Sequence, residues 1–229
     1  MHEATIGMQS YLEFLTKYAP AFFSGMVVTL EQTVLGTLLA VIVALIMGFM
    51  KMSSFVPIRW IGIVYIEIFR GTSLLVQMYW IFFVLPLFGI SLGKFEAGFL
   101  AVGLNLGAYG AELVRGGVQS VPRGQYEAAT ALSIPPFKRM LRIIFPQALL
   151  NMLPPWGNLL IELLKATALV ALISVTDLMF EAKQINMATF LSAQAFGTAL
   201  ILYYAIARLI ITPGMRGLER RLARKLSIG

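Results

Sequence analysis

The sequence lacks cysteine altogether and contains a single histidine, His2, near its N-terminal end. Without cysteine the chain has no disulfide framework, no thiol nucleophile and no thiolate metal site. One histidine at a chain end does not supply the ligand set of a zinc or haem site. We therefore expect no metal site, no cofactor and no catalytic residue of these classes.

Charged residues are also scarce, at 13% of the chain against about a quarter in an average soluble domain. Hydrophobic residues make up 59% of the 229 positions, and the mean hydropathy is +0.81. A single soluble core of this length does not bury so much apolar surface, because surface area falls only slowly relative to volume. The composition therefore indicates a protein that lies in lipid, and it argues against soluble enzymes, nucleic-acid binders and disordered scaffolds.

Five long apolar runs are each able to cross a membrane, which takes about 20 mainly apolar residues. We predict an all-α, polytopic membrane protein in which residues 1–229 form a single transmembrane domain. The second and fourth runs are long enough to be tilted or broken, and Pro213 with Gly214 marks the predicted end of the fifth. The predicted spans cover residues 21–50, 58–88, 95–114, 149–175 and 190–211.

Basic residues are distributed unequally between the two predicted sides of the membrane, and this bias predicts the orientation. The side that holds the N-terminus has only Lys17, Lys94 and Lys183, whereas the other side has twelve basic residues. The second side is therefore predicted to be cytoplasmic, with the N-terminus outside and the C-terminus inside. The net charge of +7 then reflects topology and contact with anionic membrane lipid along an arginine-rich C-terminal helix, and no nucleic-acid partner is expected.

The predicted cytoplasmic loop of residues 118–146 is too long to be left without structure. Its composition predicts a short helix from Gln125 to Leu132 and a second helix from Pro136 to about Phe145. The segment between them breaks the helix, because a residue before proline is pushed out of the helical region. Two short helices at a bend form a compact projection suited to contact with a cytoplasmic partner. The alternative is an ordinary connector between spans.

This loop carries the pattern Glu-Ala-Ala at residues Glu127–Ala129, followed by Ile143 and then by Phe145-Pro146. The pattern resembles the EAA loop of ABC importer permeases, which has Glu-Ala-Ala, a glycine and an Ile-x-Leu-Pro ending. Two positions depart from it, since Ser133 stands where the glycine is usual and Phe145 where leucine is usual. Serine adopts the conformation of a tight turn less freely than glycine does.

Three further stretches resemble the histidine- and glutamine-type permeases of the polar amino acid family. Residues 69–77 are similar to a family stretch that has proline where Ser73 stands. Residues 108–125 match the family pattern almost throughout, and residues 157–169 match its fourth span, with Ala166 where aspartate is common. The resemblance covers roughly residues 20–222.

The resemblance implies a type I ABC importer permease with a helical coupling loop, in a bacterial inner membrane. It also implies two cytoplasmic ATP-binding subunits, a second permease subunit that is identical or related, and an extracytoplasmic solute-binding protein. The chain has no Gly-x-x-x-x-Gly-Lys-Ser/Thr loop, so we expect a transport subunit and not an enzyme. The residues that the resemblance assigns to ATPase coupling are Glu127, Ala128, Ala129, Ser133, Arg123 and Gly124.

Charged residues inside the predicted spans are candidates for the solute pathway, because a charge in lipid is costly and usually faces a pathway or a partner. Glu162 and Lys165 are three residues apart on one helical face. They either neutralise each other or leave Glu162 to attract the ammonium group of a solute. Glu67 and Arg70 have the same spacing, and there we favour a structural or gating ion pair over direct solute contact.

Three neutral polar residues, Thr72, Gln77 and Asn105, are the remaining candidates for lining the pathway. Hydrogen bonding between helices is an equally good explanation for each of them. Gly103 and Gly107 form a small-x-x-x-small pair, which predicts close helix packing.

The acids that the family usually carries in its fourth span fall here at Leu159 and Ala166. Their loss disfavours a strongly cationic solute, so we expect a polar amino acid or a similar zwitterion, with an ectoine-type compatible solute as another option. The loss also favours a heterodimeric pathway in which the second permease supplies the missing groups. The alternative function is an ATP-independent secondary transporter or a channel, although the sequence shows no internal repeat of the kind that such transporters often have.

Overall fold

The computed structural model describes residues 2–226, with side chains from residue 11 to residue 225, and every regular element in that part of the chain is helical. The all-α prediction is therefore confirmed. Four helical segments in this part are long and apolar enough to cross a membrane, and a fifth span results if one bent helix pair is counted as one. The elements are α1 (His2–Lys51), α2 (Val56–Gly71), α3 (Leu74–Tyr79), η1 (Trp80–Val84), η2 (Leu85–Phe88), α4 (Lys94–Gln119), α5 (Arg123–Ala131), α6 (Pro136–Arg139), η3 (Met140–Ile144), α7 (Phe145–Thr167), η4 (Ala168–Ile173), α8 (Leu178–Thr189), α9 (Ser192–Ala205), η5 (Ile206–Ile211) and α10 (Thr212–Leu226).

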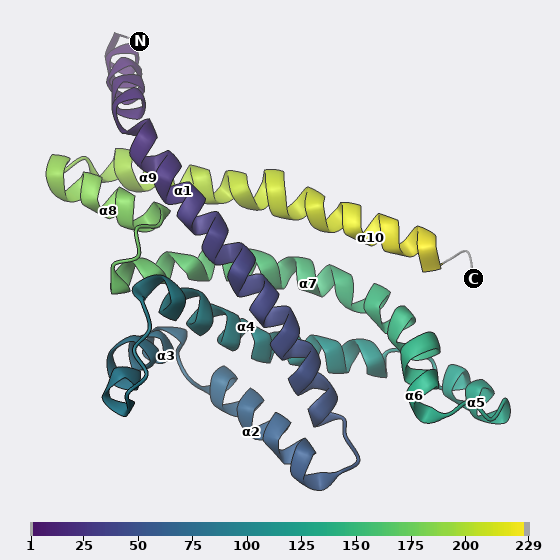
Figure 1. Cartoon of the computed structure of the whole chain (residues 1–229). Helices are drawn as coiled ribbons and strands as arrows, with labels where there is room; N and C mark the ends of the chain where they lie inside the picture. Colours follow the sequence, from purple (N-terminus) through teal and green to yellow (C-terminus); the bar gives the residue numbers. More distant parts are fainter. Residues whose placement is uncertain (1, 227–229) are drawn as a thin grey trace.

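The long helices α1, α4 and α7 form the centre of the molecule, and α1 crosses the others diagonally (Figure 1). α1 and α4 approach closely because α4 presents glycines to α1. A β-carbon added at Gly107 would lie 2.8 Å from Val43, and one added at Gly103 would lie 2.8 Å from Leu39. The close packing predicted for this glycine pair is confirmed.

The first span is longer than predicted, because α1 continues through Pro20 instead of beginning near Ala21. Phe14 and Phe22 lie on either side of the proline and are 5% and 3% exposed. Both belong to one buried cluster with residues of α8 and α9, such as Leu178. Burial on both sides of Pro20 therefore holds one continuous helix.

The second predicted span, residues 58–88, is broken. α2 ends at Gly71, α3 begins at Leu74, and the two parts meet at an angle of 105°. Thr72 between them has an extended backbone, with φ −119° and ψ 155°. The part of this span after the bend consists of short α, π and 3₁₀ segments that end at Phe88.

The fourth span and the loop before it differ from the prediction. The second short helix predicted for residues 136–145 is not separate, since α6, η3 and α7 follow one another in a helical segment from Pro136 to Ile173. A π-helical turn at Met140–Ile144 ends two residues before Pro146. Proline has no backbone N–H to donate. The i→i+5 hydrogen bonds of a π-helical turn let the helix continue past this missing donor.

The helix of the fifth span does not end at Pro213 as predicted, for the same reason. α9, η5 and α10 continue from Ser192 to Leu226, and the π-turn Ile206–Ile211 precedes the proline. Thr212 Oγ1 donates a hydrogen bond to the carbonyl oxygen of Ala207, at 2.8 Å, within this turn. Both prolines thus follow a local rearrangement of the hydrogen bonds and do not end a helix.

No pattern in the sequence predicts α8, which lies between the fourth and fifth spans. Asp177 caps it, because its Oδ1 accepts a hydrogen bond from the backbone amide of Phe180 at 2.9 Å. One face of α8 packs on α1 and α9. α8 lies at one end of the molecule, whereas α5, α6 and the end of α10 lie at the other (Figure 1).

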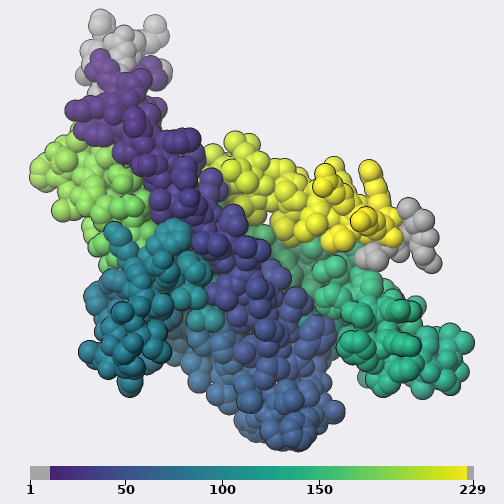
Figure 2. Space-filling view, in the orientation of Figure 1, coloured from purple at the N-terminus to yellow at the C-terminus, as the bar shows by residue number. Residues whose placement is uncertain are grey.

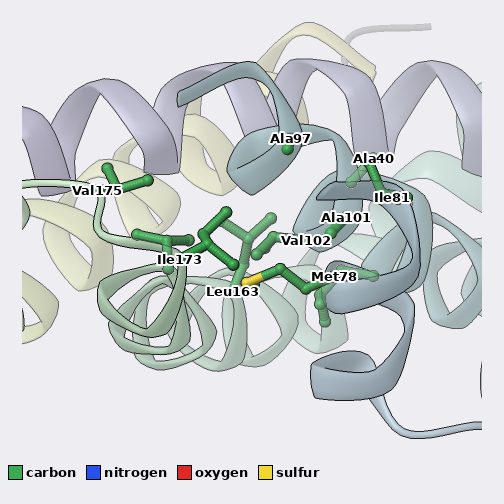
Figure 3. Packing of buried hydrophobic residues seen from close by; sticks show 11 residues of the cluster. Ala40, Met78, Ile81, Ala97, Ala101, Val102, Leu163, Ile173 and Val175 are labelled. Carbon is green, nitrogen blue, oxygen red and sulfur yellow. The ribbon is translucent and has the colours of Figure 1, made fainter. Parts of the chain in front are cut away.

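The largest buried cluster joins the broken span to the central helices. Met78 of α3 points toward Val102 of α4 and Leu163 of α7 (Figure 3), and Met78 and Leu163 are fully buried. Lipid is as apolar as these side chains, so close van der Waals packing, and not exclusion of water, stabilises the cluster. The cluster therefore fixes the position of α3, just beyond the bend.

Candidate functional site

Thr72, Gln77 and Asn105 lie together at the bend between α2 and α3. Asn105 Nδ2 donates hydrogen bonds to the carbonyl oxygen of Phe69 at 2.9 Å and to Gln77 Oε1 at 3.0 Å. Gln77 Nε2 donates to Thr72 Oγ1 at 2.6 Å and also to the Phe69 carbonyl oxygen at 3.0 Å. The structure therefore joins the three predicted neutral pathway residues in one group, which we call the bend network.

The bend network satisfies backbone groups that the break in the helix would leave without partners. The last carbonyl oxygens of a helix have no N–H partner within that helix, and lipid offers them no hydrogen-bond donor. Asn105 and Gln77 supply donors to the carbonyl of Phe69, and Thr72 Oγ1 donates to the carbonyl of Ile68 at 2.7 Å. This arrangement favours hydrogen bonding between helices over solute contact for these residues.

Arg70 does not pair with Glu67, so the ion pair predicted for them is wrong. Among the residues that the structure describes, the acidic partner of Arg70 is Glu112, with 4.0 Å between Nη1 and Oε1. The Arg70 guanidinium also lies 5.2 Å from the centre of the Tyr109 ring. α2 packs against α4, so residues of α4 compete with the nearby Glu67 for this guanidinium.

Glu112 is the centre of a charged cluster, the Glu112 cluster, which charge spacing in the sequence did not predict, although Glu112 lies in the family-like stretch 108–125. It contacts Lys51 at the end of α1, Arg115 on α4 at 2.8 Å and Arg70 on α2. The Glu112 side chain is 17% exposed. Three basic side chains around one carboxylate make this an ion-pair centre, and within residues 11–225 no group of three or more His, Cys, Asp or Glu side chains that could hold a metal ion occurs.

Glu162 and Lys165 form an ion pair on α7, with 2.5 Å between Oε1 and Nζ. Their side chains are 62% and 59% exposed, so the pair faces away from the packed core of this chain. Asn158 is exposed on the same helical face, one turn before Glu162. A polar face of this kind on a membrane span requires a partner other than lipid.

The predicted coupling residues lie in a lobe that α5 and α6 form at the end of the molecule opposite α8 (Figure 2). Glu127, Ala128, Arg123 and Gly124 are exposed on α5, whereas Ala129 is only 2% exposed. One side of α5 thus packs on the body, and the side that carries Glu127 is open.

Two apolar side chains that sequence patterns did not single out project from the same lobe. Leu132 is 74% exposed and Phe137 is 77% exposed, on either side of the turn that follows α5. Large apolar side chains beside an exposed carboxylate are typical of a surface that another protein covers. Their position beside the predicted break between the two short helices was the feature of the sequence that could have indicated their exposure.

Ser133 occupies the turn between α5 and α6 with a left-handed backbone, at φ 54°. The backbone amide of Ile134 donates to the carbonyl oxygen of Ala129 at 3.0 Å and closes this turn. The left-handed region is favourable for glycine and costs other residues free energy. The structure therefore requires a glycine-like conformation at the position where the EAA pattern has glycine.

Tyr126 connects α5 to the end of α4. Its hydroxyl donates to the carbonyl oxygen of Val118 at 3.1 Å, and the Arg139 guanidinium lies 5.8 Å from the centre of its ring. Burial raises the pKa of Tyr126, so the phenol stays protonated and keeps donating. Arg139 also donates to Thr130 Oγ1 at 2.8 Å, which holds α5 against α6.

Comparison with known proteins provides independent information on this chain. The family model described as "Binding-protein-dependent transport system inner membrane component" matches residues 32–224. A probable amino-acid ABC transporter permease protein of Sinorhizobium fredii is 41% identical over 206 residues, covering 87% of this chain and 86% of the relative. The L-cystine transport system permease protein of Bacillus subtilis is 35% identical over 211 residues, covering 90% and 88%. A crystal structure of an amino acid ABC transporter with histidines aligns with a TM-score of 0.83 at 38% identity, covering 90% of this chain and 96% of the matched chain.

Proposed function

The chain belongs to the binding-protein-dependent transport system inner membrane components, and we propose that it is the permease subunit of an ATP-driven amino-acid importer. The observation that carries the solute class is the match along most of its length to amino-acid permeases. A polar, zwitterionic amino acid agrees with the absence of acids at Leu159 and Ala166. These relatives give no support to an ectoine-type solute or to ATP-independent transport.

ATP hydrolysis takes place on separate subunits, and the α5–α6 lobe receives their motion. Glu127 faces outward to meet a basic group of an ATPase, while Leu132 and Phe137 supply apolar contact. α6, η3 and α7 are continuous, so a displacement of the lobe is carried directly into the fourth span. Alternating access then follows from movement of that span and its polar face.

The polar face of α7 with Glu162 lines the solute pathway in this proposal. Its ion pair with Lys165 is exposed in the single chain, so a second permease subunit faces it across the pathway. A related subunit is favoured over an identical one, because it can supply the missing acids. Two ATP-binding subunits beneath the permeases and an extracytoplasmic solute-binding protein complete the complex.

The chain lies in a bacterial inner membrane with its N-terminus outside and its C-terminus in the cytoplasm. This orientation rests on the distribution of basic residues, and it agrees with the position of α5, α6 and the end of α10 at the same end of the molecule (Figure 1). The arginine-rich α10 then runs toward the anionic inner surface of the membrane.

Purification of the tagged chain from its native membranes in a mild detergent, followed by mass spectrometry, tests the assembly. We expect a stoichiometric P-loop ATPase and a second, related permease. Vesicles that contain this complex, the binding protein and internal ATP should then accumulate labelled L-cystine or L-histidine. A chain that purifies alone even after crosslinking, or uptake that needs no ATP, would contradict the proposal.

A further inference from the structure

A polar cavity of about 290 Å³ lies between α7 and the η5–α10 helix, apart from the ion pair and the networks described above. Arg208 and Arg216 line it, with Asn158 on the opposite wall and Glu219 at one end. Ile161 and Met215 form part of its apolar wall. We call it the arginine cavity.

The arginine cavity has an excess of positive charge. Two guanidinium groups and one carboxylate line it, and Arg208 makes no hydrogen bond or ion pair with any residue between 11 and 225. A guanidinium inside a membrane span is costly without an anionic partner. An anion from outside the described part of the chain would be a favourable partner for Arg208.

The depth of Arg208 argues against a lipid headgroup as that partner. α7 and η5–α10 run in opposite directions, and Gly157 faces Met215, since a β-carbon at Gly157 would lie 3.7 Å from Met215. Arg208 is seven residues from Met215 toward the other end of the helix, which is roughly 10 Å at 1.5 Å per residue. This places Arg208 near the level of the Glu162–Lys165 pair, well inside the span and away from the headgroups at its ends.

The arginine cavity also opens beside the polar face of α7. Asn158, Glu162 and Lys165 follow one another at helical spacing on that face, and Asn158 belongs to the cavity wall as well. The cavity is therefore continuous with the surface that lines the solute pathway in the proposed function. A solute that moves along this face meets Arg208 on one side and the ion pair on the other.

We infer that the arginine cavity is a carboxylate subsite of the solute pathway, in which Arg208 binds the carboxylate of the transported amino acid. This inference rests on the proposed function. A guanidinium matches a carboxylate with two parallel N–H donors, and Asn158 offers an amide donor from the facing helix. Arg216, closer to the cytoplasmic end, receives the carboxylate next as the solute leaves.

The absence of native cysteine makes a direct test practicable. Thr212 lines the arginine cavity, so Thr212→Cys introduces the only thiol of the chain into its wall. The intact complex with this variant is treated with two methanethiosulfonate reagents, one with a sulfonate and one with a trimethylammonium group, and labelling of this chain is followed by mass. We expect the sulfonate reagent to react at least tenfold faster, after correction for its rate with a free thiol.

Protection by ligands identifies the group that the cavity binds. L-Histidine and L-cystine should slow labelling at Thr212→Cys at least fivefold, whereas their α-amides, which lack the carboxylate, should not. Arg208→Gln in the same background should remove both the preference for the sulfonate reagent and the protection. Arg220→Gln, which removes the same charge from α10 outside the cavity, should leave both effects unchanged.

The outcomes separate this inference from the proposed function. A complex that imports L-histidine or L-cystine but shows neither preference nor protection, or equal protection by acid and amide, overturns the carboxylate subsite and leaves the importer. A complex that imports neither amino acid, but whose thiol is protected by acetate through Arg208, retains the carboxylate site and removes the proposed solute. Loss of protection in the Arg220→Gln control also overturns the assignment to Arg208.

Discussion

Asn105 Nδ2 on α4 lies 2.9 Å from the carbonyl oxygen of Phe69, two residues before the end of α2. This contact joins a break in one span to the middle of another. Asn105 is only 5% exposed, so water does not replace its hydrogen bonds. The bend of 105° between α2 and α3 therefore depends on a side chain from a different helix.

Replacement of Asn105 by leucine should destabilise the protein. Gln77 Oε1 loses its hydrogen-bond donor, and the Phe69 carbonyl oxygen loses one of its two donors. The free energy of unfolding should fall by about 1–3 kcal/mol. Thermal unfolding in detergent measures the loss. Gln184→Leu on the exposed surface of α8 is the control, and a control that loses as much stability would contradict a specific role of the bend network.

Replacement of Glu112 by glutamine should also destabilise the chain, because Lys51, Arg115 and Arg70 lose their shared carboxylate. The expected loss is about 1.5–3 kcal/mol, typical of hydrogen bonds to charged groups. Glu67→Gln is the matched control and should leave the unfolding temperature nearly unchanged. If Glu67→Gln proved the more damaging of the two, the ion pairing derived from the structure would be incorrect.

Ser133→Gly should stabilise the α5–α6 lobe by about 1 kcal/mol, because glycine adopts the left-handed backbone without strain. Ser133→Val should do the opposite. Limited proteolysis of the lobe, together with thermal unfolding, reports the change. Ser120→Gly provides the comparison, since Ser120 has an ordinary φ of −76° and should gain nothing. Equal gains at both positions would argue against strain at Ser133.

Charge reversal at Glu127 should separate folding from coupling. Glu127 is exposed, so Glu127→Lys should insert and unfold as the wild-type chain does. Its copurification with the ATPase should fall at least tenfold, because a desolvated charge pair becomes a repulsive one. Glu13→Lys, an exposed reversal near the other end of the molecule, should retain the ATPase. Normal ATPase recovery and normal uptake with Glu127→Lys would exclude the coupling role.

Asp177 should make the stability of the region around α8 depend on pH. Burial raises the pKa of its carboxyl from 3.8 to about 6, although the Phe180 amide and the Tyr203 hydroxyl both donate to it. A raised folded-state pKa contributes stability that is fully present below about pH 4 and is lost as the pH rises through about 6. The difference corresponds to about 3 kcal/mol.

The unfolding temperature of the wild-type chain should therefore fall between pH 5 and pH 7 through this group. Asp177→Asn keeps an acceptor for the cap and carries no charge, so its unfolding temperature should change less over the same range. Unfolding curves at pH 5, 6 and 7 for both proteins test this. Identical pH profiles would show that Asp177 is ionised in the folded protein without cost.

Several features of the fold follow from local properties of the sequence. The apolar runs and the scarcity of charge were sufficient to predict an all-helical membrane protein, because about 20 apolar residues in succession have few other stable environments. α5 was predicted within two residues at its start and one at its end. The distribution of basic residues also predicted a common side for the loop and the C-terminus.

The failures concern prolines and contacts between distant residues. Pro146 and Pro213 were expected to end or separate helices, and π-turns that no simple pattern reveals carry the helix through both. α8 was missed because its apolar face forms only against α1 and α9. The pair Glu67–Arg70 has the right spacing in the sequence, but Arg70 turns to Glu112 instead.

The sequence by itself determined the membrane class, the Glu-Ala-Ala pattern of the loop and the set of polar residues inside the spans. Hydropathy and motif spacing are properties of short segments, so they can be read without knowledge of how the helices pack. Only the tertiary structure decided which polar residues meet. The bend is supported by Thr72, Gln77 and Asn105, and Glu112 contacts three basic side chains. One cavity is lined by both Arg208 and Asn158. Such contacts between helices depend on how the helices cross, which no short segment of sequence determines.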